Sequence, residues 1–208
     1  MKLILQLFLL LVLTAGCGDD DQPAANYQQE LADLPTDATG CANSLVMDDG
    51  TMLPLDKPIN GLKKDTTYRI LSMLVRGETS THLTGYVPIL SLPVTHYKKE
   101  NPQSDAVSVV ACWQTKRYIN LHLQIQGTSQ GVHYFGVQHK GETSLADGTR
   151  ILQARLIHDR HNDPEHYSRD TYLSVPLLPL REELSAGRDS LWLSIPCAEG
   201  DKVYKFRL

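Results

Sequence analysis

Apolar and polar residues alternate without a break in the stretch Tyr118-Ile119-Asn120-Leu121-His122-Leu123-Gln124-Ile125. Successive side chains of a β-strand point to opposite faces, so one face of this segment is expected in a core and the other in contact with solvent. Antiparallel sheets with one covered face show this alternation. The stretch therefore predicts a half-buried antiparallel strand.

The same two-residue period returns several times between this strand and the end of the chain. It is found at residues 152–156, 173–177, 191–195 and 204–208, with turn-rich clusters at 127–131, 141–148 and 200–201 between the segments. Only residues 179–186 have a helical pattern, and that segment is short. Several short strands separated by turns favour a β-sandwich or a closed barrel.

The first half of the chain also has the pattern of short strands. An apolar run at residues 44–47 leads into Asp48-Asp49-Gly50, and a second run follows at 52–55. Asp-Gly between two apolar runs is a strong hairpin signal. Further strands are expected at residues 68–75 and 86–92. The polar segment 98–105, which contains Pro102, is the expected boundary between two domains.

The N-terminus has the features of a secretory signal. Lys2 precedes an apolar run from Leu3 to Leu13, which is about half of the roughly 20 residues that a membrane-spanning helix needs. Thr14-Ala15-Gly16-Cys17 follows and resembles a bacterial lipobox, although the usual leucine stands one position early, at Leu13. We predict a signal peptide over residues 1–16 and a lipid anchor on Cys17 that attaches the protein to a membrane. An ordinary cleaved signal with an incidental cysteine is the alternative.

Residues 17–35 are expected to form a flexible acidic tether, with room for one or two helical turns at Tyr27–Leu34. Asp19, Asp20 and Asp21 follow the predicted anchor, and such a run does not pack into a core. The run also resembles the surface-export signal of Bacteroidota lipoproteins. This resemblance implies an envelope protein of the outer membrane that is displayed at the cell surface. The alternative is a flexible tether without an export signal.

The charge balance argues against a nucleic-acid partner. The chain has a formal net charge of −4 at neutral pH, and its lysines and arginines are dispersed. Binding to a nucleic acid depends on clustered positive charges that neutralise phosphates. We therefore predict no nucleic-acid binding.

Three cysteines remain beyond the predicted anchor: Cys41, Cys112 and Cys197. Two of them could form a disulfide in an exported protein, and buried free thiols are the alternative. No CxxC spacing is present, which argues against a zinc ribbon or a thioredoxin-like site. We predict no cofactor.

Gly127-Thr128-Ser129-Gln130-Gly131 matches the GxSxG pattern of a nucleophile elbow. A catalytic serine of this type stands on a sharp turn between a strand and a helix. The residues after Gly131 have the pattern of a strand, so a Gly/Ser hairpin loop explains the segment better. Ser129 is therefore a candidate nucleophile only for an alternative function.

A cluster of possible metal ligands follows the segment at residues 152–156. His158, His161, Asp163 and His166 lie within nine residues, and imidazole and carboxylate groups bind divalent metals. Pro164 and the preceding strand favour a loop, and the spacing matches no zinc-site pattern. A structural loop is the preferred interpretation, and metal binding is the alternative.

Aromatic residues could line a sugar-binding surface through their ring faces. The candidates are Tyr86, His96, Tyr97, Tyr118, His133, Tyr134, Tyr167 and Tyr172. They are scattered along the chain, and tyrosines are common in strands for reasons of packing alone. The sequence leaves the ligand-binding residues undefined.

Three short motifs resemble the NigD-like lipoproteins of Bacteroidota. Asp48-Asp49-Gly50 matches the DDG turn of that family, and Trp113 followed by Tyr118-Ile119-Asn120-Leu121 resembles its aromatic and YLN strand. Leu156-Ile157-His158-Asp159, with Asp163 beyond it, resembles its LRHN…D segment. Ile157 stands where the family has arginine and Asp159 where it has asparagine, so a polar role of these two positions is in question.

The resemblance implies an all-β chain with a small OB-like barrel over residues 36–97 and an antiparallel β-sandwich over residues 104–208. It supplies no catalytic residues, and bacteriocin immunity is the role associated with the family name. We predict a non-enzymatic surface module that binds a protein, a glycan or a toxin. An envelope hydrolase or metal-binding protein that uses Ser129 or the His158–His166 cluster is the first alternative. A structural or assembly factor of a surface complex is the second.

Overall fold

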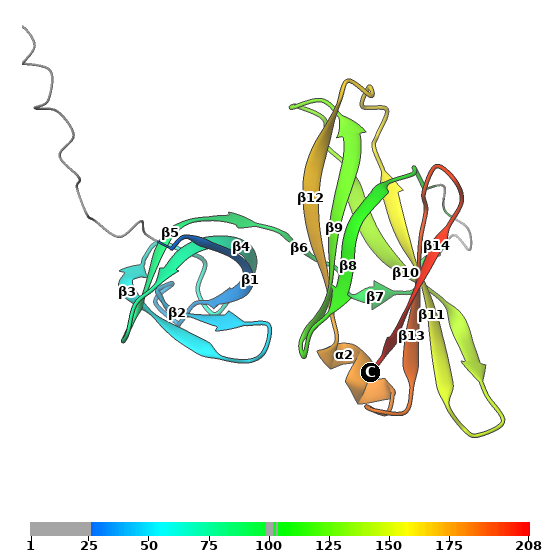
Figure 1. Ribbon diagram of the computed structural model, residues 1–208, viewed down its shortest axis with the longest axis horizontal. Helices are drawn as coiled ribbons and strands as arrows, with labels where there is room; N and C mark the ends of the chain where they lie inside the picture. Colours follow the sequence, from blue (N-terminus) through cyan, green and yellow to red (C-terminus); the bar gives the residue numbers. More distant parts are fainter. Residues whose placement is uncertain (1–25, 99–101, 103) are drawn as a thin grey trace, which may run out of the picture.

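The computed structural model of the protein describes residues 26–98, 102 and 104–208, which form two β-rich units side by side (Figure 1). The predicted signal peptide, Cys17 and the acidic run lie outside the described residues. Strands dominate, and the chain is all-β as predicted. None of the helices in the described ranges has the length and apolar character needed to cross a membrane.

The first unit is a closed five-stranded barrel, which confirms the predicted OB-like barrel. Its strands pair in the order β1-β2-β3-β5-β4, and β1 pairs antiparallel with β4 to close it. Buried aliphatic side chains from β1, β2 and β4 fill the interior, with Leu34, Leu45 and Ile70 fully covered. The strands are β1 (Gln28–Pro35), β2 (Ala42–Met47), β3 (Met52–Ile59), β4 (Thr67–Arg76) and β5 (Thr81–Pro88).

The hairpin predicted at Asp48-Asp49-Gly50 is confirmed. It joins β2 to β3, with Val46 opposite Met52 in the antiparallel register. Gly50 has a φ of +92°, which a residue without a Cβ adopts at little cost. The Asp49 carboxylate accepts a hydrogen bond from the Thr51 backbone N–H at 2.7 Å and fixes the turn.

The prediction of a flexible tether over residues 17–35 is wrong for the C-terminal part of this segment. Residues Gln28–Pro35 form β1, which pairs with β4 over its whole length and with β2 at two positions. The helical turns expected at Tyr27–Leu34 are absent for the same reason. The central strand β4 offers a full row of backbone partners, and these override a weak local preference for helix.

The second unit is the predicted sandwich of two sheets that pack face to face. One sheet has the order β14-β13-β11-β10-β7 and the other β6-β12-β9-β8. The strands are β6 (Leu90–Ser91), β7 (Val94–Thr95), β8 (Ser108–Gln114), β9 (Tyr118–Gly127), β10 (Tyr134–Ser144), β11 (Arg150–Asp159), β12 (Tyr167–Pro176), β13 (Ser190–Ile195) and β14 (Lys202–Arg207). The short helix α2 (Leu178–Glu183) confirms the one helical segment that was expected.

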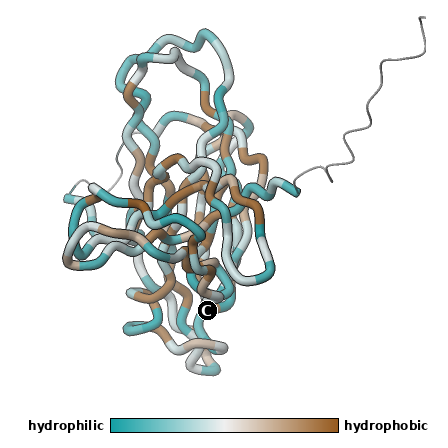
Figure 2. Tube along the Cα trace, turned by 90° about the vertical axis from the view of Figure 1, so that its left-hand side faces the viewer, coloured by the Kyte–Doolittle hydropathy of each residue, from teal (hydrophilic) through white to brown (hydrophobic). Residues whose placement is uncertain are grey.

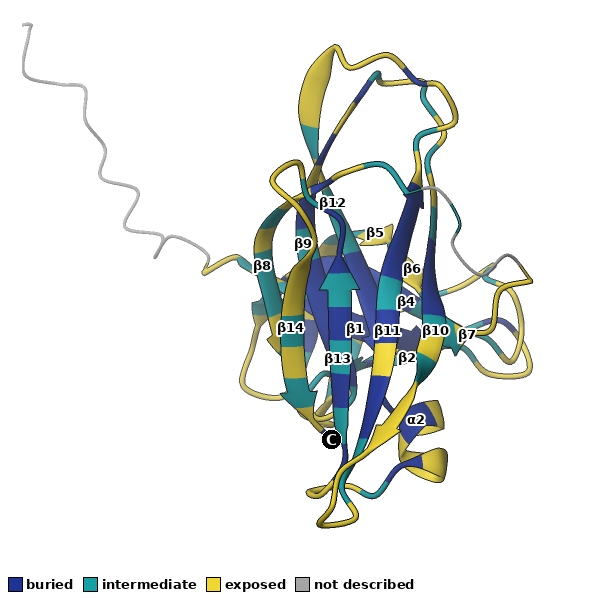
Figure 3. Ribbon diagram, turned by 90° about the vertical axis from the view of Figure 1, so that its right-hand side faces the viewer, coloured by how far each residue is buried: buried dark blue, intermediate teal, exposed yellow. Residues whose placement is uncertain are grey.

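The alternating stretch of residues 118–125 lies at the centre of the sandwich. Ile119, Leu121, Leu123 and Ile125 of β9 point into the core and are almost fully buried. Figure 3 shows the facing sheet, in which buried and intermediate residues alternate along β13 and the edge strand β14 is mostly exposed. Figure 2 likewise shows hydrophobic segments running through the body of the molecule and hydrophilic ones at the loop tips. Burial of one strand face therefore sets the fold of this unit.

The predicted boundary between residues 97 and 104 is wrong, because the sandwich begins earlier. β6 pairs with β12 and β7 pairs with β10, so residues 90–95 already belong to the two sheets of the sandwich. The strand expected at residues 86–92 is divided between β5 of the barrel and β6 of the sandwich. Each of these sandwich pieces has only two residues, which is too short for a period to be visible in the sequence.

The prediction of a hairpin loop at Gly127–Gly131 is also wrong in one respect. The segment is a loop, but β9 pairs with β8 and β12 whereas β10 belongs to the opposite sheet. The loop therefore crosses between the two sheets at one end of the sandwich.

Candidate functional site

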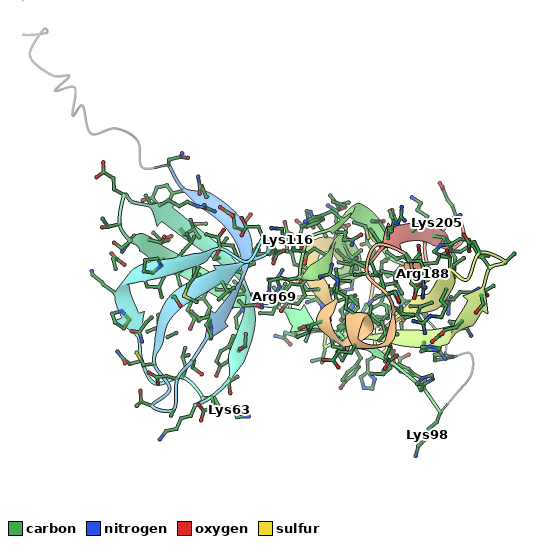
Figure 4. All side chains as sticks on the ribbon, turned by 90° about the horizontal axis from the view of Figure 1, so that it is seen from below. Lys63, Arg69, Lys98, Lys116, Arg188 and Lys205 are labelled. Atoms are coloured by element: carbon green, nitrogen blue, oxygen red, sulfur yellow. The ribbon has the colours of Figure 1, made fainter. Side chains whose placement is uncertain are left out.

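The barrel and the sandwich meet at a buried arginine. Arg69 of β4 lies 4% exposed, and its guanidinium is within 3.2 Å of Asp33 and 2.6 Å of Asp48 in the barrel. Its Nη2 donates to the Asn120 side-chain oxygen at 3.1 Å and its Nε to the Ser174 hydroxyl at 3.0 Å, both in the sandwich. Figure 4 shows Arg69 between the two units. Charged hydrogen bonds of this type fix geometry as well as add energy.

Two residues of the sandwich also bind the Asp33 carboxylate of the barrel. The Arg117 guanidinium donates to Asp33 at 2.5 Å, and the Tyr118 hydroxyl donates to it at 2.9 Å. The Tyr118 ring also lies under the Arg69 guanidinium, 3.9 Å from its carbon to the ring centroid. Burial, together with the Asp33 charge, raises the pKa of Tyr118 to about 12, so the phenol stays neutral and keeps its donor proton.

The junction explains two of the three sequence motifs. Asp48 of the DDG turn accepts a hydrogen bond from the Asn120 amide at 2.6 Å, and Asn120 accepts another from Ser174 at 2.7 Å. Two carboxylates, Asp33 and Asp48, thus face two guanidiniums. Buried polar groups need such complete pairing. Sequence reasoning missed this network, because its hydrogen-bonded partners are up to 105 positions apart in the chain.

A cleft of about 510 Å³ opens beside the junction. Its barrel side is formed by β1, the β2–β3 turn and β4, and its sandwich side by β8, the segment that follows it and β12. The residues that line it are Gln29, Glu30, Leu31, Met47, Asp48, Asp49, Leu71, Arg76, Trp113, Thr115, Lys116 and Tyr172. Asp48 belongs to both the cleft and the network, so the network holds the two walls of the cleft in place. Figure 4 labels Lys116 at this position.

Aromatic rings are the main apolar feature of the sandwich wall of the cleft. Trp113 is 37% exposed, and the Tyr172 ring stacks on His122 with centroids 4.3 Å apart. Among the described residues, no ring or cation covers Trp113. Clefts between domains with exposed rings and a few polar groups are typical ligand sites.

The third motif lies at the far end of the sandwich, where it forms a second buried network. His133 donates or accepts at both ring nitrogens: its Nδ1 is 2.8 Å from His158 Nε2, and its Nε2 is 3.0 Å from the Asp163 carboxylate. His158 Nδ1 lies 3.3 Å from the Asp105 carbonyl oxygen. His158 is 1% exposed and stacks on Phe135.

The donors in this chain of contacts follow from its two ends. The Asp163 carboxylate and the Asp105 carbonyl only accept hydrogen bonds, so the ring nitrogens of His133 and His158 that face them are donors. Burial, followed by the electrostatic interaction with His133, lowers the pKa of His158.

The two glycines of the GxSxG pattern have a steric reason to be glycine. A Cβ on Gly127 or Gly131 would overlap the Asp163 carboxylate. The loop instead wraps the carboxylate, with the Thr128 backbone N–H at 2.7 Å and its hydroxyl at 2.6 Å. The Thr128 hydroxyl and N–H, with His133, lower the pKa of Asp163 to about 2. The segment is thus a carboxylate-binding loop.

The structure does not assemble the candidate catalytic groups. Ser129 is exposed, and within the described part of the chain its hydroxyl has no hydrogen-bond partner. Both nitrogens of the nearby His133 are engaged by Asp163 and His158, so that ring has no free nitrogen to act as a base toward Ser129. His133 is the member of this cluster that the metal hypothesis did not include.

The four candidate metal ligands are also separated. His158 and Asp163 are buried in the network, whereas His161 packs edge-on against Tyr134 and His166 is exposed. Over residues 26–98, 102 and 104–208, no three His, Cys, Asp or Glu side chains are grouped in a way that could bind a metal ion.

Of the eight aromatic candidates for a sugar surface, Tyr172 is the one that lines the cleft. Tyr118 and His133 are committed to the two buried networks, and Tyr86 packs against the barrel core. Trp113 lines the cleft and was missing from that set. The position of Trp113 on the same sheet face as Tyr172 depends on the pairing of β8, β9 and β12.

Cys41, Cys112 and Cys197 are free thiols, which excludes a disulfide between them, but each is half-buried rather than buried as the alternative supposed. Burial raises the pKa of the Cys112 thiol to about 12, so this thiol stays protonated and unreactive at neutral pH.

These features define a class of protein: a two-unit all-β protein with a cleft at the junction of barrel and sandwich. Residues 91–208 match the family described as NigD-like C-terminal beta sandwich domain, and the chain belongs to this family. The start of the match at residue 91 agrees with the boundary that β6 defines. A comparison with curated proteins finds no match.

Solved structures from Bacteroidales share the fold across both units. A NigD-like immunity protein from Bacteroides caccae has 20% identity and a TM-score of 0.65, covering 86% of this chain and 90% of that one. A "Putative TOXIN related protein" from Parabacteroides distasonis has 14% identity and a TM-score of 0.67, covering 88% and 93%. A "Putative lipoprotein" from Bacteroides fragilis has 13% identity and a TM-score of 0.60, covering 86% and 97%. At these identities the likeness concerns the fold.

Proposed function

We propose that the protein is a lipid-anchored envelope protein that binds an extracellular partner in the cleft between barrel and sandwich. The observation that carries the proposal is the uncovered Trp113 ring in a cleft of about 510 Å³ whose walls are joined by a buried ionic network. A rigid cleft loses little conformational freedom on binding. The proposed role is non-enzymatic, and the unassisted Ser129 supports this.

Attachment through Cys17, on the outer surface of the outer membrane, is part of the proposal. It is supported by the lipobox-like sequence Thr14-Ala15-Gly16-Cys17, by the acidic residues that follow it and by the fold shared with a protein described as a lipoprotein. Cells fed radioactive palmitate should label the wild-type chain but not a Cys17→Ser variant. Protease added to intact cells should then degrade the labelled protein; an unlabelled or fully protected wild type would contradict the anchoring or the display.

The binding role is tested by capture from cell-envelope fractions with the immobilised protein. Trp113→Ala should lose the captured material, whereas Trp192→Ala should retain it. Trp192 is the other tryptophan of the chain and lies on the opposite sheet, where Lys205 covers its ring at 4.0 Å. Figure 4 shows Lys205 on the side of the sandwich away from the barrel. Equal capture by wild type and Trp113→Ala would contradict a role of the cleft.

The name of the Bacteroides caccae relative suggests an alternative partner, a polypeptide toxin whose binding would confer immunity. Protease treatment of the envelope fraction before capture would then abolish binding. Periodate, which cleaves the vicinal diols of sugars, would leave it unchanged.

A further inference from the structure

The sandwich wall of the cleft is the outer face of the sheet β6-β12-β9-β8, and its register places side chains in rows. Trp113 lies opposite Asn120, which lies opposite Ser174, and this row meets the barrel. The next row contains His122 and Tyr172. Strands are about 4.8 Å apart and alternate residues about 7 Å apart, so Trp113 and Tyr172 are separated by about 12 Å. Two ring platforms at this spacing suit an elongated ligand with several flat units.

Further rows continue this face with polar side chains. Asp170 binds His122 at 2.8 Å, and Ser168 binds Gln126 at 2.6 Å. Gln124 lies between these pairs and is exposed, and in the described residues its amide has no hydrogen-bond partner. Amides, carboxylates and imidazoles offer donors and acceptors in fixed planes, which suits a ligand rich in hydroxyl groups.

The charges in and beside the cleft neutralise one another. Glu30 pairs with Arg76 at 2.8 Å, and Asp48 pairs with Arg69 at 2.6 Å. The Thr51 backbone N–H lowers the pKa of Asp49, and the Lys116 charge acts in the same direction. No cluster of like charges therefore remains in this cleft to attract a phosphate, a sulfate or a uronic acid.

The aliphatic lining of the cleft is mostly covered. Leu31 is 8% exposed and Met47 is 4% exposed, whereas Leu71 is half-buried, so the ring faces are an important part of the accessible apolar surface. Protein partners gain most of their affinity from side chains that insert into desolvated pockets. Ring faces surrounded by hydrogen-bonding groups favour a sugar over a polypeptide.

We propose that the cleft binds an uncharged oligosaccharide, with one sugar ring on Trp113 and another beside the Tyr172–His122 stack. This inference rests on the proposed function and names its ligand class.

The test uses the two tryptophans of the chain. In a Trp192→Phe background, Trp113 is the sole tryptophan, and its emission reports on the cleft. Uncharged oligosaccharides of glucose, mannose, galactose and xylose are titrated beside oligosaccharides of galacturonic acid and sulfated oligosaccharides. At least one uncharged probe should give a saturable emission change and protect Trp113 from acrylamide quenching. Tyr172→Ala should weaken that binding about tenfold, as expected for loss of a ring contact, whereas Tyr172→Phe should retain it.

The outcomes separate the ligand class from the proposed function. Periodate-sensitive, Trp113-dependent capture from envelope fractions that is competed by an uncharged oligosaccharide supports the inference. Stronger binding of the charged probes overturns it. Trp113-dependent capture that survives periodate but not protease also overturns it, yet leaves the binding role of the cleft in place. Absence of any Trp113-dependent capture removes both.

Discussion

The two buried polar networks of this protein neutralise their carboxylates in different ways. At the junction, Asp33 and Asp48 face the guanidiniums of Arg69 and Arg117. At the far end of the sandwich, Asp163 is held by backbone and hydroxyl donors and by an imidazole. A guanidinium stays charged at every relevant pH, whereas an imidazole gains or loses its proton near neutrality.

The two networks have different structural roles. The junction joins two separate hydrophobic cores and lies beside the cleft, whose walls it connects. The far-end network closes two loops over one end of a single core, and its stability depends on pH. Substitutions in the two places should therefore differ in magnitude, in their effect on ligand binding and in pH dependence.

The largest effect is expected for Arg69→Met. It leaves the buried Asp33 and the half-buried Asp48 without their shared cation, and breaking a buried ion pair costs about 3–5 kcal/mol. Urea denaturation measures the loss. Arg76→Met is the matched control, since Arg76 lies on the same strand in an exposed pair with Glu30 that contributes about 0–1 kcal/mol. Equal losses in the two variants would contradict the junction's role.

A smaller loss is expected for Tyr118→Phe. The change removes the hydroxyl that donates to Asp33 across the junction, and a hydrogen bond to a charged group contributes about 1.5–3 kcal/mol. Tyr204→Phe should be close to neutral, because within the described ranges the Tyr204 hydroxyl has no hydrogen-bond partner. Tyr118→Phe should also bind cleft ligands more weakly than the wild type. Unchanged stability and binding in Tyr118→Phe would show that the two units do not depend on this contact.

Gly131→Ala sharpens the comparison at the other network. The new methyl group would overlap the Asp163 carboxylate, and overpacking of a tight site costs about 1–3 kcal/mol. Gly85→Ala on β5 is the control, since its Cβ would meet no atom within 4 Å. Thermal denaturation should show a lower Tm for Gly131→Ala, with ligand binding at the distant cleft unchanged. A cleft defect in this variant would mean that the two networks are coupled.

The smallest effect is the pH dependence of the far-end network. Because folding lowers the pKa of His158 below its ordinary 6.5, the unfolded chain takes up the proton first. The stability from this group is therefore complete above pH 6.5 and decreases as the pH falls. Asp163 contributes a second loss of folding stability as the pH falls from its ordinary pKa of 3.8 through its lowered pKa of about 2.

Chemical denaturation between pH 7.5 and 4.5 measures the first of these losses. His158→Gln, which does not titrate, should give a flatter curve over the window below pH 6.5. Arg76→Met should keep the wild-type slope. An identical slope for wild type and His158→Gln would contradict the assignment of a neutral, buried His158.

Several elements could be predicted from local pattern. The alternation at residues 118–125 predicted β9, and Asp48-Asp49-Gly50 predicted the β2–β3 hairpin, because both signals act within a few residues. β1 was missed, since Gln28–Pro35 becomes a strand through its pairing with β4. The two-residue strands β6 and β7 are too short to carry a period, so the boundary was placed too late.

The candidate site shows the same division. Asp48, Tyr118, Asn120, His158 and Asp163 were recognised as motif residues. Their partners Arg69, Arg117 and Ser174 were not, and His133 was considered only as a ring for a sugar surface. Gly127 and Gly131 were visible as a pattern whose reason, room for a carboxylate, required the fold.

Local patterns were enough to predict an all-β chain, its main hairpin and sandwich strands, the lipobox-like N-terminus and the family motifs, because alternation, turn chemistry and residue type are local properties. The roles of the motif residues depend instead on the tertiary structure. Strand pairing places Trp113 and Tyr172 on the same sheet face along one cleft and sets Arg69 against two carboxylates from one unit and two polar groups from the other. Contacts between positions tens of residues apart depend on the register and packing of whole sheets, which no short stretch encodes.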